Sequence, residues 1–313
     1  MEMNLSSSVG VSSTERLITA INGASLLVCL LAAILVFALR LHHKVVYRLA
    51  LYQVLASLSC ATVGVFQLIF VNYAENPRVY GRVCVAIGWL LLYGLWMKLL
   101  FTTWLTLHLF CFGVLNKNLK RYEALYVVSS LLVPGVIGAV PLITGTYALD
   151  RTHTVCYIDE PNLNGSATGY YHTAVTERIV LWEVPAVVAL LVCSVAMVSM
   201  VTSLTRQACY RMRYEPLADD NQFLKAMKQL LPLAAFPILF LIFMIPALIF
   251  NVYSFISVPQ MALTITAFIS TSLWSMTSGL TLIVHITVAR CALKRKRYLV
   301  AHRAQYSKAL TVF

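Results

Sequence analysis

Two ionisable residues interrupt long apolar stretches of the sequence. Lys98 lies within the apolar stretch 83–115, and Glu183 lies within the stretch 179–204. An ionisable group inside a membrane helix is costly, so it usually faces a bundle interior or a wet cavity and marks a functional site. Three arrangements are open: a direct ion pair, an outward-facing pocket with Glu183 at its rim and Lys98 near its floor, or side chains that only reach headgroups or water.

The positions of the two charges along their helices favour the pocket over the ion pair. At a rise of about 1.5 Å per residue, Lys98 lies roughly 20 Å from the outer end of its helix. Glu183 lies only about 6–8 Å from the outer end of its own helix by the same rise. Helix tilt and the long Lys98 side chain can close part of this gap.

Tryptophans flank both charges, and Trp96, Trp182 and Trp274 are further candidates for the ligand pocket. Trp96 and Lys98 are two residues apart and point about 200° away from each other on a helix, so at most one can centre on a pocket. Trp182 lies near a membrane edge and also fits an interfacial anchor. Small and polar residues between Ser270 and Gly279 suit close helix packing.

The composition limits the kind of protein that can position these residues. Of the 313 residues, 60% are hydrophobic and 12% are charged, about half the charged share of soluble domains. Too few charges remain to cover a soluble surface, which excludes a soluble enzyme, a disordered chain and a free nucleic-acid binder. P-loop, Gly-x-Ser-x-Gly, His-Glu-x-x-His and Cys-x-x-Cys motifs are absent. We expect a membrane protein that is not an enzyme and has no metal or cofactor.

Seven apolar stretches are long enough to cross a bilayer. A hydrocarbon core about 30 Å thick needs roughly 20 apolar residues in a helix. Backbone groups in lipid must be satisfied internally, which predicts α-helices. The sequence therefore predicts one all-α domain over 1–313, a seven-transmembrane-helix bundle. The predicted helices are about 17–39, 49–71, 83–115, 124–146, 179–204, 229–253 and 260–289.

The basic residues are distributed unevenly over the connections between these stretches. One set of connections holds 18 of the 24 Lys and Arg residues, namely 40–48, 116–123, 205–228 and 290–313. The other set holds five, namely 1–16, 72–82, 147–178 and 254–259. The positive-inside rule places the first set in the cytoplasm, with the N-terminus outside and the C-terminus inside. The net charge of +12 then mostly reflects the basic residues of the cytoplasmic connections.

Two weaker signals agree with this orientation. Asn4 and Asn164 begin Asn-x-Ser triplets and are candidate glycosylation sites, and both fall on the predicted outer face. Among eight cysteines, Cys84 and Cys156 are the two at or outside the outer edge, where disulfides persist. Two free thiols are the alternative.

The segment 290–313 is a basic cytoplasmic tail. Residues 290–303 are predicted to form a short basic juxtamembrane helix along the membrane. Such a cluster is attracted to anionic inner-leaflet lipid by about 1 kcal/mol per basic residue near the surface. Cys209 and Cys291 are candidates for palmitoylation, with an unmodified thiol as the alternative at each.

The predicted helix number and orientation, the two outer cysteines and the basic tail together resemble the G-protein-coupled receptor superfamily. In architecture, the resemblance covers nearly the whole chain, but few sequence motifs carry it. Within the superfamily, the chain looks closer to the cyclic-AMP-receptor-like group and its secretin/adhesion-type relatives than to rhodopsin-like receptors, whose Asp-Arg-Tyr, Cys-Trp-x-Pro and Asn-Pro-x-x-Tyr motifs it lacks. The residues that carry this are Phe101-Thr102-Thr103-Trp104, Cys156-Tyr157-Ile158-Asp159 and Trp182-Glu183. Tyr157 departs from the Cys-Trp-Ile common in that group.

The resemblance implies a disulfide between Cys84 and Cys156, a cell-surface location in the plasma membrane, and a role in signal transduction. An extracellular ligand would bind between the outer ends of the helices and shift an equilibrium between two conformations. A heterotrimeric G protein would then bind the cytoplasmic loops. The candidate contacts are Lys120, Arg121, Lys225 and Lys228, for which charges that only set topology are the alternative.

A small-solute transporter or channel is the main rival function. Many transporters show internal repeats, and none is visible here. A light-sensing rhodopsin needs a Lys on the last helix, and 260–289 contains none. The receptor interpretation is therefore preferred.

Overall fold

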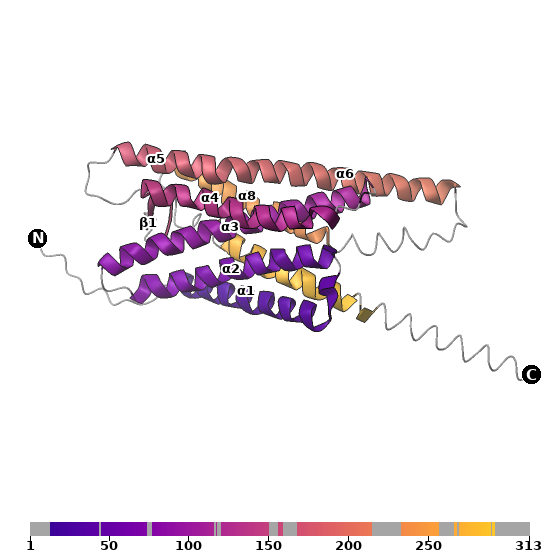
Figure 1. Cartoon of the computed structure of the whole chain (residues 1–313), viewed down its shortest axis with the longest axis horizontal. Helices are drawn as coiled ribbons and strands as arrows, with labels where there is room; N and C mark the ends of the chain where they lie inside the picture. Colours follow the sequence, from indigo (N-terminus) through magenta and orange to yellow (C-terminus); the bar gives the residue numbers. More distant parts are fainter. Residues whose placement is uncertain are drawn as a thin grey trace, which may run out of the picture.

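Long helices lie beside one another along the long axis of the molecule in the computed structural model (Figure 1). The structure describes residues 13–43, 45–73, 77–115, 117, 120–149, 156–158, 168–214, 233–256, 266–267, 269–288 and 290–291. The main elements are α1 (Ser13–Ala38), α2 (Val45–Tyr73), α3 (Pro77–Gly113), α4 (Glu123–Thr144), β1 (Tyr147–Leu149), β2 (Cys156–Ile158), α5 (Thr168–Arg178), η3 (Ile179–Glu183), α6 (Val184–Tyr214) and α8 (Ala235–Ile256). Residues 269–288 are also helical.

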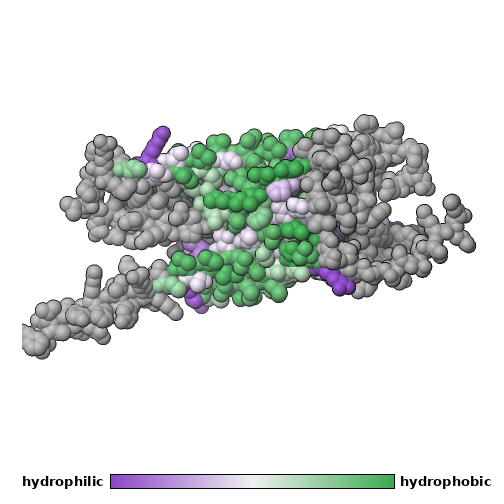
Figure 2. Space-filling view, turned by 180° about the vertical axis from the view of Figure 1, so that it is seen from behind, coloured by the Kyte–Doolittle hydropathy of each residue, from purple (hydrophilic) through white to green (hydrophobic). Residues whose placement is uncertain are grey.

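Apolar side chains cover the outside of these helices. Large Leu, Ile and Val residues are exposed on every one of the long helices, and Ile143 is 85% exposed. Figure 2 shows such residues gathered over the middle of one face. Within the described residues, five helices are long and apolar enough to cross a membrane, and α8 contains a shorter apolar run, Ala235–Ile249. An apolar exterior of this kind is stable in lipid rather than water, so the prediction of a multi-pass helical membrane protein is confirmed.

The helices extend beyond the apolar stretches seen in the sequence. The predicted helix 83–115 begins at Pro77 instead, and the predicted helix 179–204 is the middle of a longer run, α5–η3–α6, that starts at Thr168. Residues 168–178 are mostly polar. Apolar residues identify the part of a helix that lies in lipid. The helix itself continues beyond that part, because its backbone hydrogen bonds do not require apolar side chains.

The described residues are mostly helical, as the all-α prediction requires, and they also contain a short hairpin that the prediction did not include. Strands β1 and β2 pair antiparallel, with Tyr147 opposite Ile158 and Leu149 opposite Cys156. The hairpin lies in a connection between predicted helices. This connection contains too few apolar residues to be predicted as a membrane-spanning element.

Helix α1 packs closely on the last helix. Ser25 donates a hydrogen bond to the Ser272 carbonyl at 2.9 Å, and Ser272 donates to Asn22 Oδ1 at 2.9 Å. A Cβ atom on Gly279 would lie 3.2 Å from the Cys29 backbone nitrogen. Since backbone cannot move aside as a flexible side chain can, the glycine sets how near the two helices come.

Gly279→Leu is therefore expected to lower the free energy of unfolding by about 1–3 kcal/mol or more, because overpacking forces backbone shifts. The matched control is Gly23→Leu, at a helical glycine of α1 where an added Cβ would meet nothing within 4 Å. That variant should be neutral or slightly stabilising. Thermal unfolding of both purified variants in one detergent tests the contrast, and equal losses would contradict it.

Candidate functional site

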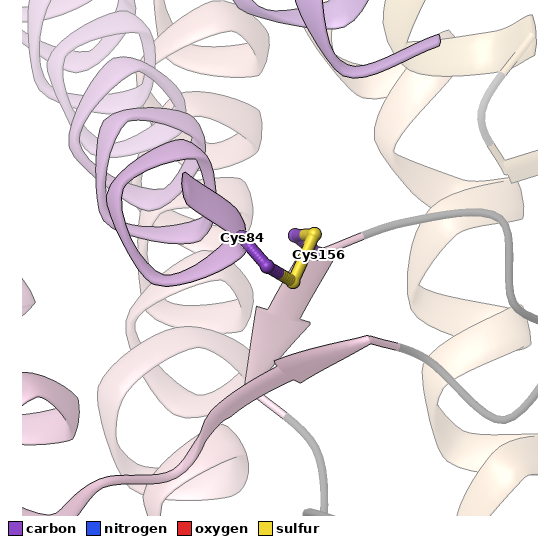
Figure 3. The surroundings of a disulfide bond; sticks show 2 residues. All are labelled: Cys84 and Cys156. Atoms are coloured by element: carbon purple, nitrogen blue, oxygen red, sulfur yellow. A yellow bond between two sulfur atoms is a disulfide. The ribbon is translucent and has the colours of Figure 1, made fainter. Parts of the chain in front are cut away.

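The structure contains a disulfide between Cys84 of α3 and Cys156 of β2 (Figure 3). It fastens the β1–β2 hairpin to one end of the bundle, which we call the disulfide end. Gly88 lies one turn further along α3, and a Cβ there would be 2.8 Å from the Tyr147 ring. A glycine at this position lets the hairpin lie against the helix.

Polar contacts tie the same hairpin to two more helices. The Tyr147 hydroxyl donates to the Gly138 carbonyl of α4 at 3.1 Å, and Thr146 donates to the Glu177 carboxylate of α5. Burial raises the pKa of Tyr147 above its usual value, so the hydroxyl keeps the proton that it donates. Contacts with α3, α4 and α5 therefore hold the hairpin at the disulfide end.

The π-helical turn η3 is connected to α3 through a tryptophan. Pro185 has no N–H, so the carbonyl of Leu181, four residues earlier, loses its helical donor. The Trp96 indole Nε1–H donates to this carbonyl at 2.9 Å. Trp96 therefore satisfies a backbone group that the proline leaves free, a role that the sequence alone did not reveal.

Trp96→Phe is expected to lower the free energy of unfolding by about 0.5–1.5 kcal/mol, because the partly buried Leu181 carbonyl would lose its hydrogen bond from Nε1. Trp89→Phe is the matched control, since the Trp89 Nε1–H is buried without a hydrogen-bond partner among the described residues. That second change removes no such bond and should cost clearly less. Denaturation of the two variants side by side measures the difference, and a larger loss for Trp89→Phe would refute the assigned role.

Glu183 ends the η3 turn and is buried. Its side chain is 7% exposed, and neither carboxylate oxygen has a hydrogen-bond partner within the described part of the chain. Trp182, beside it, is also buried in an apolar cluster with Trp96 and Trp274. The interpretation of Trp182 as an interfacial anchor is therefore wrong, because the ring faces the bundle and not the membrane surface.

Lys98 is completely buried and faces the last helix. Its ammonium donates to Ser275 Oγ at 2.8 Å and to the Thr271 carbonyl at 3.2 Å. The nitrogen also lies 3.7 Å from the centroid of the Trp274 ring, a cation–π contact. An ammonium has three N–H donors, so these three neighbours can satisfy all of them.

The two intramembrane charges do not pair with each other. The donor contacts of Lys98 are all on the last helix, and the Glu183 oxygens have no partner among the described residues. Of the three arrangements open from the sequence, the direct ion pair is the one that the contacts contradict. Trp96 and Lys98 reach different helices, in agreement with their separation of about 200° around α3.

A row of buried polar residues on α2 was missed from the sequence. Gln53, Ser57 and Gln67 are buried, and each has a side-chain polar atom without a partner among the described residues. Their spacing in whole helical turns places them on one face with Cys60. A polar stripe at helical spacing within an apolar segment was the signal available in the sequence.

The opposite end of the bundle contains an ion pair that was also missed. Arg48 of α2 donates from two guanidinium nitrogens to the Glu123 carboxylate at the start of α4. It also donates to the carbonyls of His42 and His43. Arg48 thus ties the turn after α1 to both helices.

The other predicted site residues are placed only in part. Arg121 is exposed and Lys120 lies in the short helix η2 (Lys120–Tyr122) at the Arg48–Glu123 end. Cys209 and Cys291 are free and exposed. Asn4, Asn164, Lys225 and Lys228 lie outside the described residues, as does the tail beyond Cys291. Among the described residues, no group of three or more His, Cys, Asp or Glu side chains could hold a metal ion.

Comparison with solved structures defines the fold. The chain is similar to squid rhodopsin, with a TM-score of 0.68 and 11% sequence identity over 90% of this chain and 85% of that one. No family model matches the sequence, and no curated protein sequence matches it. The chain therefore has a helical fold similar to that of squid rhodopsin.

Proposed function

We propose that this chain is a plasma-membrane receptor that binds an extracellular ligand inside the helix bundle and signals through a heterotrimeric G protein. The disulfide end faces outward, with the N-terminus outside and the C-terminus in the cytoplasm. Seven helices cross the membrane. The distribution of Lys and Arg over the connections supports this orientation.

The observation that carries the proposal is the buried Glu183 carboxylate at the disulfide end. A buried carboxylate without hydrogen bonds does not stabilise the fold, so we assign Glu183 a role in function. In a fold similar to that of squid rhodopsin, such a group near the outer end of the bundle suits a ligand site. Lys98, deeper in the same bundle, connects α3 to the last helix and is suited to pass a ligand-induced shift between them.

The opposite end is the proposed G-protein side. Arg121 is exposed there, and Lys120 precedes it on the same turn. Lys225 and Lys228 complete the basic contacts by their place in the sequence. The basic tail after residue 290 binds anionic lipid, with Cys209 and Cys291 available for palmitoylation and Asn4 and Asn164 for glycosylation.

We further infer a place on the cyclic-AMP-receptor-like side of the superfamily. This rests on the residues Trp104, Cys156 to Asp159, and Trp182-Glu183. Of these, Trp104 stacks on Tyr126 and donates to Ser129 Oγ at 3.1 Å, which joins α3 to α4.

The deciding experiment screens the full chain in cells against a ligand library. G-protein activation and solute uptake are measured in the same cells. Ligand-dependent G-protein activation that is absent from untransfected cells is expected. Solute uptake or ion current without G-protein activation would instead support a transporter or channel and overturn the proposal.

A further inference from the structure

Glu183 differs from the other acidic side chains that the structure describes in detail. Glu123 pairs with Arg48, and Glu177 accepts a hydrogen bond from Thr146. Glu183 is as deeply buried as Glu177, yet both its oxygens lack a hydrogen-bond partner within the described residues. A carboxylate can accept about four hydrogen bonds, so this group has its full accepting capacity free.

One polar group near Glu183 is also unsatisfied. The Tyr157 hydroxyl, on the hairpin strand β2, is buried and has no partner among the described residues. Burial raises the pKa of Tyr157, and the charge of Glu183 raises it further, while Arg178 acts in the opposite direction. Tyr157 therefore stays protonated, within electrostatic range of Glu183, with one donor to offer.

The surroundings of the two groups are otherwise apolar. The residues that pack together at this end include Trp96, Trp182, Tyr147, Ile158 and Ala186. Such surroundings match an apolar or aromatic ligand body, and the donors that Trp96 and Tyr147 carry are already used for the carbonyls of Leu181 and Gly138. A bound ligand can supply the donors that these side chains do not give to Glu183.

The charge of Glu183 determines which donor fits. A protonated amine brings up to three N–H donors and a positive charge, and charge-assisted hydrogen bonds are stronger than neutral ones. A neutral hydroxyl brings one donor and no charge. A ligand carboxylate would be repelled. Arg178 lies within electrostatic range of Glu183 but gives its oxygens no hydrogen bond.

We propose that Glu183 anchors the protonated amine of a ligand with an apolar or aromatic body, and that the Tyr157 hydroxyl makes the second polar contact. This inference rests on the proposed function, because it names the class of ligand for the same site. It assigns separate roles to the two intramembrane charges: Glu183 binds the ligand, and Lys98 connects helices beneath it.

The test uses the full chain, purified into lipid nanodiscs, and measures the thermal unfolding temperature. The probes are matched pairs that differ in the amine alone: ethylamine and ethanol, phenethylamine and phenethyl alcohol, tryptamine and tryptophol, each at millimolar concentration. Indole-3-acetate is the anionic probe. We expect at least one aromatic amine to raise the unfolding temperature by about 3 °C or more, while its alcohol and the anion have no effect. Equal shifts for amine and alcohol, or no shift with any amine, would overturn the proposal.

Glu183→Gln keeps the shape of the side chain and removes its charge. We expect it to abolish the amine-dependent shift and to leave the ligand-free unfolding temperature unchanged or higher, because a buried carboxylate without hydrogen bonds is removed. Glu177→Gln is the matched control on the same continuous helix. It should lower the ligand-free temperature through its contact with Thr146 but keep the shift. A Glu183→Gln variant that still responds to amines, or that unfolds at a markedly lower temperature without ligand, would refute the anchor role.

The readout also separates this inference from the proposed function. Binding in nanodiscs involves no G protein, so an amine-specific shift without G-protein activation in cells would uphold the site and reject the receptor. Activation by a neutral ligand, unchanged in Glu183→Gln, would uphold the receptor and reject the amine anchor.

Discussion

Replacing Cys84 or Cys156 with Ser is expected to lower surface expression several-fold. The disulfide joins residues 72 positions apart, and loss of a native disulfide typically costs about 2–5 kcal/mol. The hairpin that it holds has three residues in each strand, and a two-stranded sheet is marginally stable by itself. Losses of this size change cellular abundance strongly. Flow cytometry with an extracellular tag measures the effect.

The double variant is the critical comparison for this disulfide. Each cysteine acts through the same bond, so replacing both should be no worse than replacing one. Cys111→Ser is the control, because Cys111 is a free cysteine of α3, and its surface level should be near that of the wild type. A mass map that finds the Cys84 and Cys156 thiols both free would refute the bond.

Substitutions at Lys98 are expected to separate its volume from its charge. Lys98→Ala should lower the free energy of unfolding by about 2–5 kcal/mol, the usual cost of truncating a fully buried side chain. Lys98→Met keeps the volume, and its cost should stay below about 1.5 kcal/mol. The lost hydrogen bonds are offset because a buried charge no longer has to be desolvated. Ser275 Oγ also still reaches the Thr271 carbonyl, at 3.3 Å.

We expect signalling to depend on the charge of the Lys98 side chain and not on its volume. In dose–response curves corrected for surface level, Lys98→Met should shift the response, since the link from α3 to Ser275 and Thr271 is cut. Leu99→Met, at the neighbouring buried position, is the matched control and should not shift it. An unchanged curve for Lys98→Met would remove Lys98 from the signalling pathway. A loss of stability for Lys98→Met as large as that for Lys98→Ala would mean that the ammonium contacts, and not the volume of the side chain, hold the bundle together.

The apolar stretches predicted where the helices lie but not where they end. The prediction located α1, α2 and α4 to within about four residues at each end, because a lipid-spanning helix is apolar over most of its length. It missed the first eleven residues of the α5–η3–α6 run, since Thr168–Arg178 lies beyond the apolar part. The β1–β2 hairpin was not predicted either, because it also lies outside the apolar stretches.

The candidate site was predicted by residue type but not by contact. Lys98 and Glu183 were identified because charges are rare in apolar helices. The partners of Lys98 are a carbonyl, a hydroxyl and a ring on a helix more than 170 residues further along the chain, and none of these has a distinctive sequence pattern. The role of Trp96 depends on the Leu181 carbonyl that Pro185 leaves without a helical donor. Predicting this role requires knowledge of which helices pack against each other.

The sequence by itself determined that this is a multi-pass helical membrane protein with two charges inside the bundle, because lipid imposes length and apolarity on every spanning segment whatever its neighbours. The tertiary structure decided which groups meet: Lys98 with the last helix, Trp96 with Leu181, Arg48 with Glu123, and Glu183 with no described partner. In lipid there is little hydrophobic drive between helices, so the pairing depends on close packing and interhelical hydrogen bonds. Those are set by shape across separate segments rather than by the composition of any one of them.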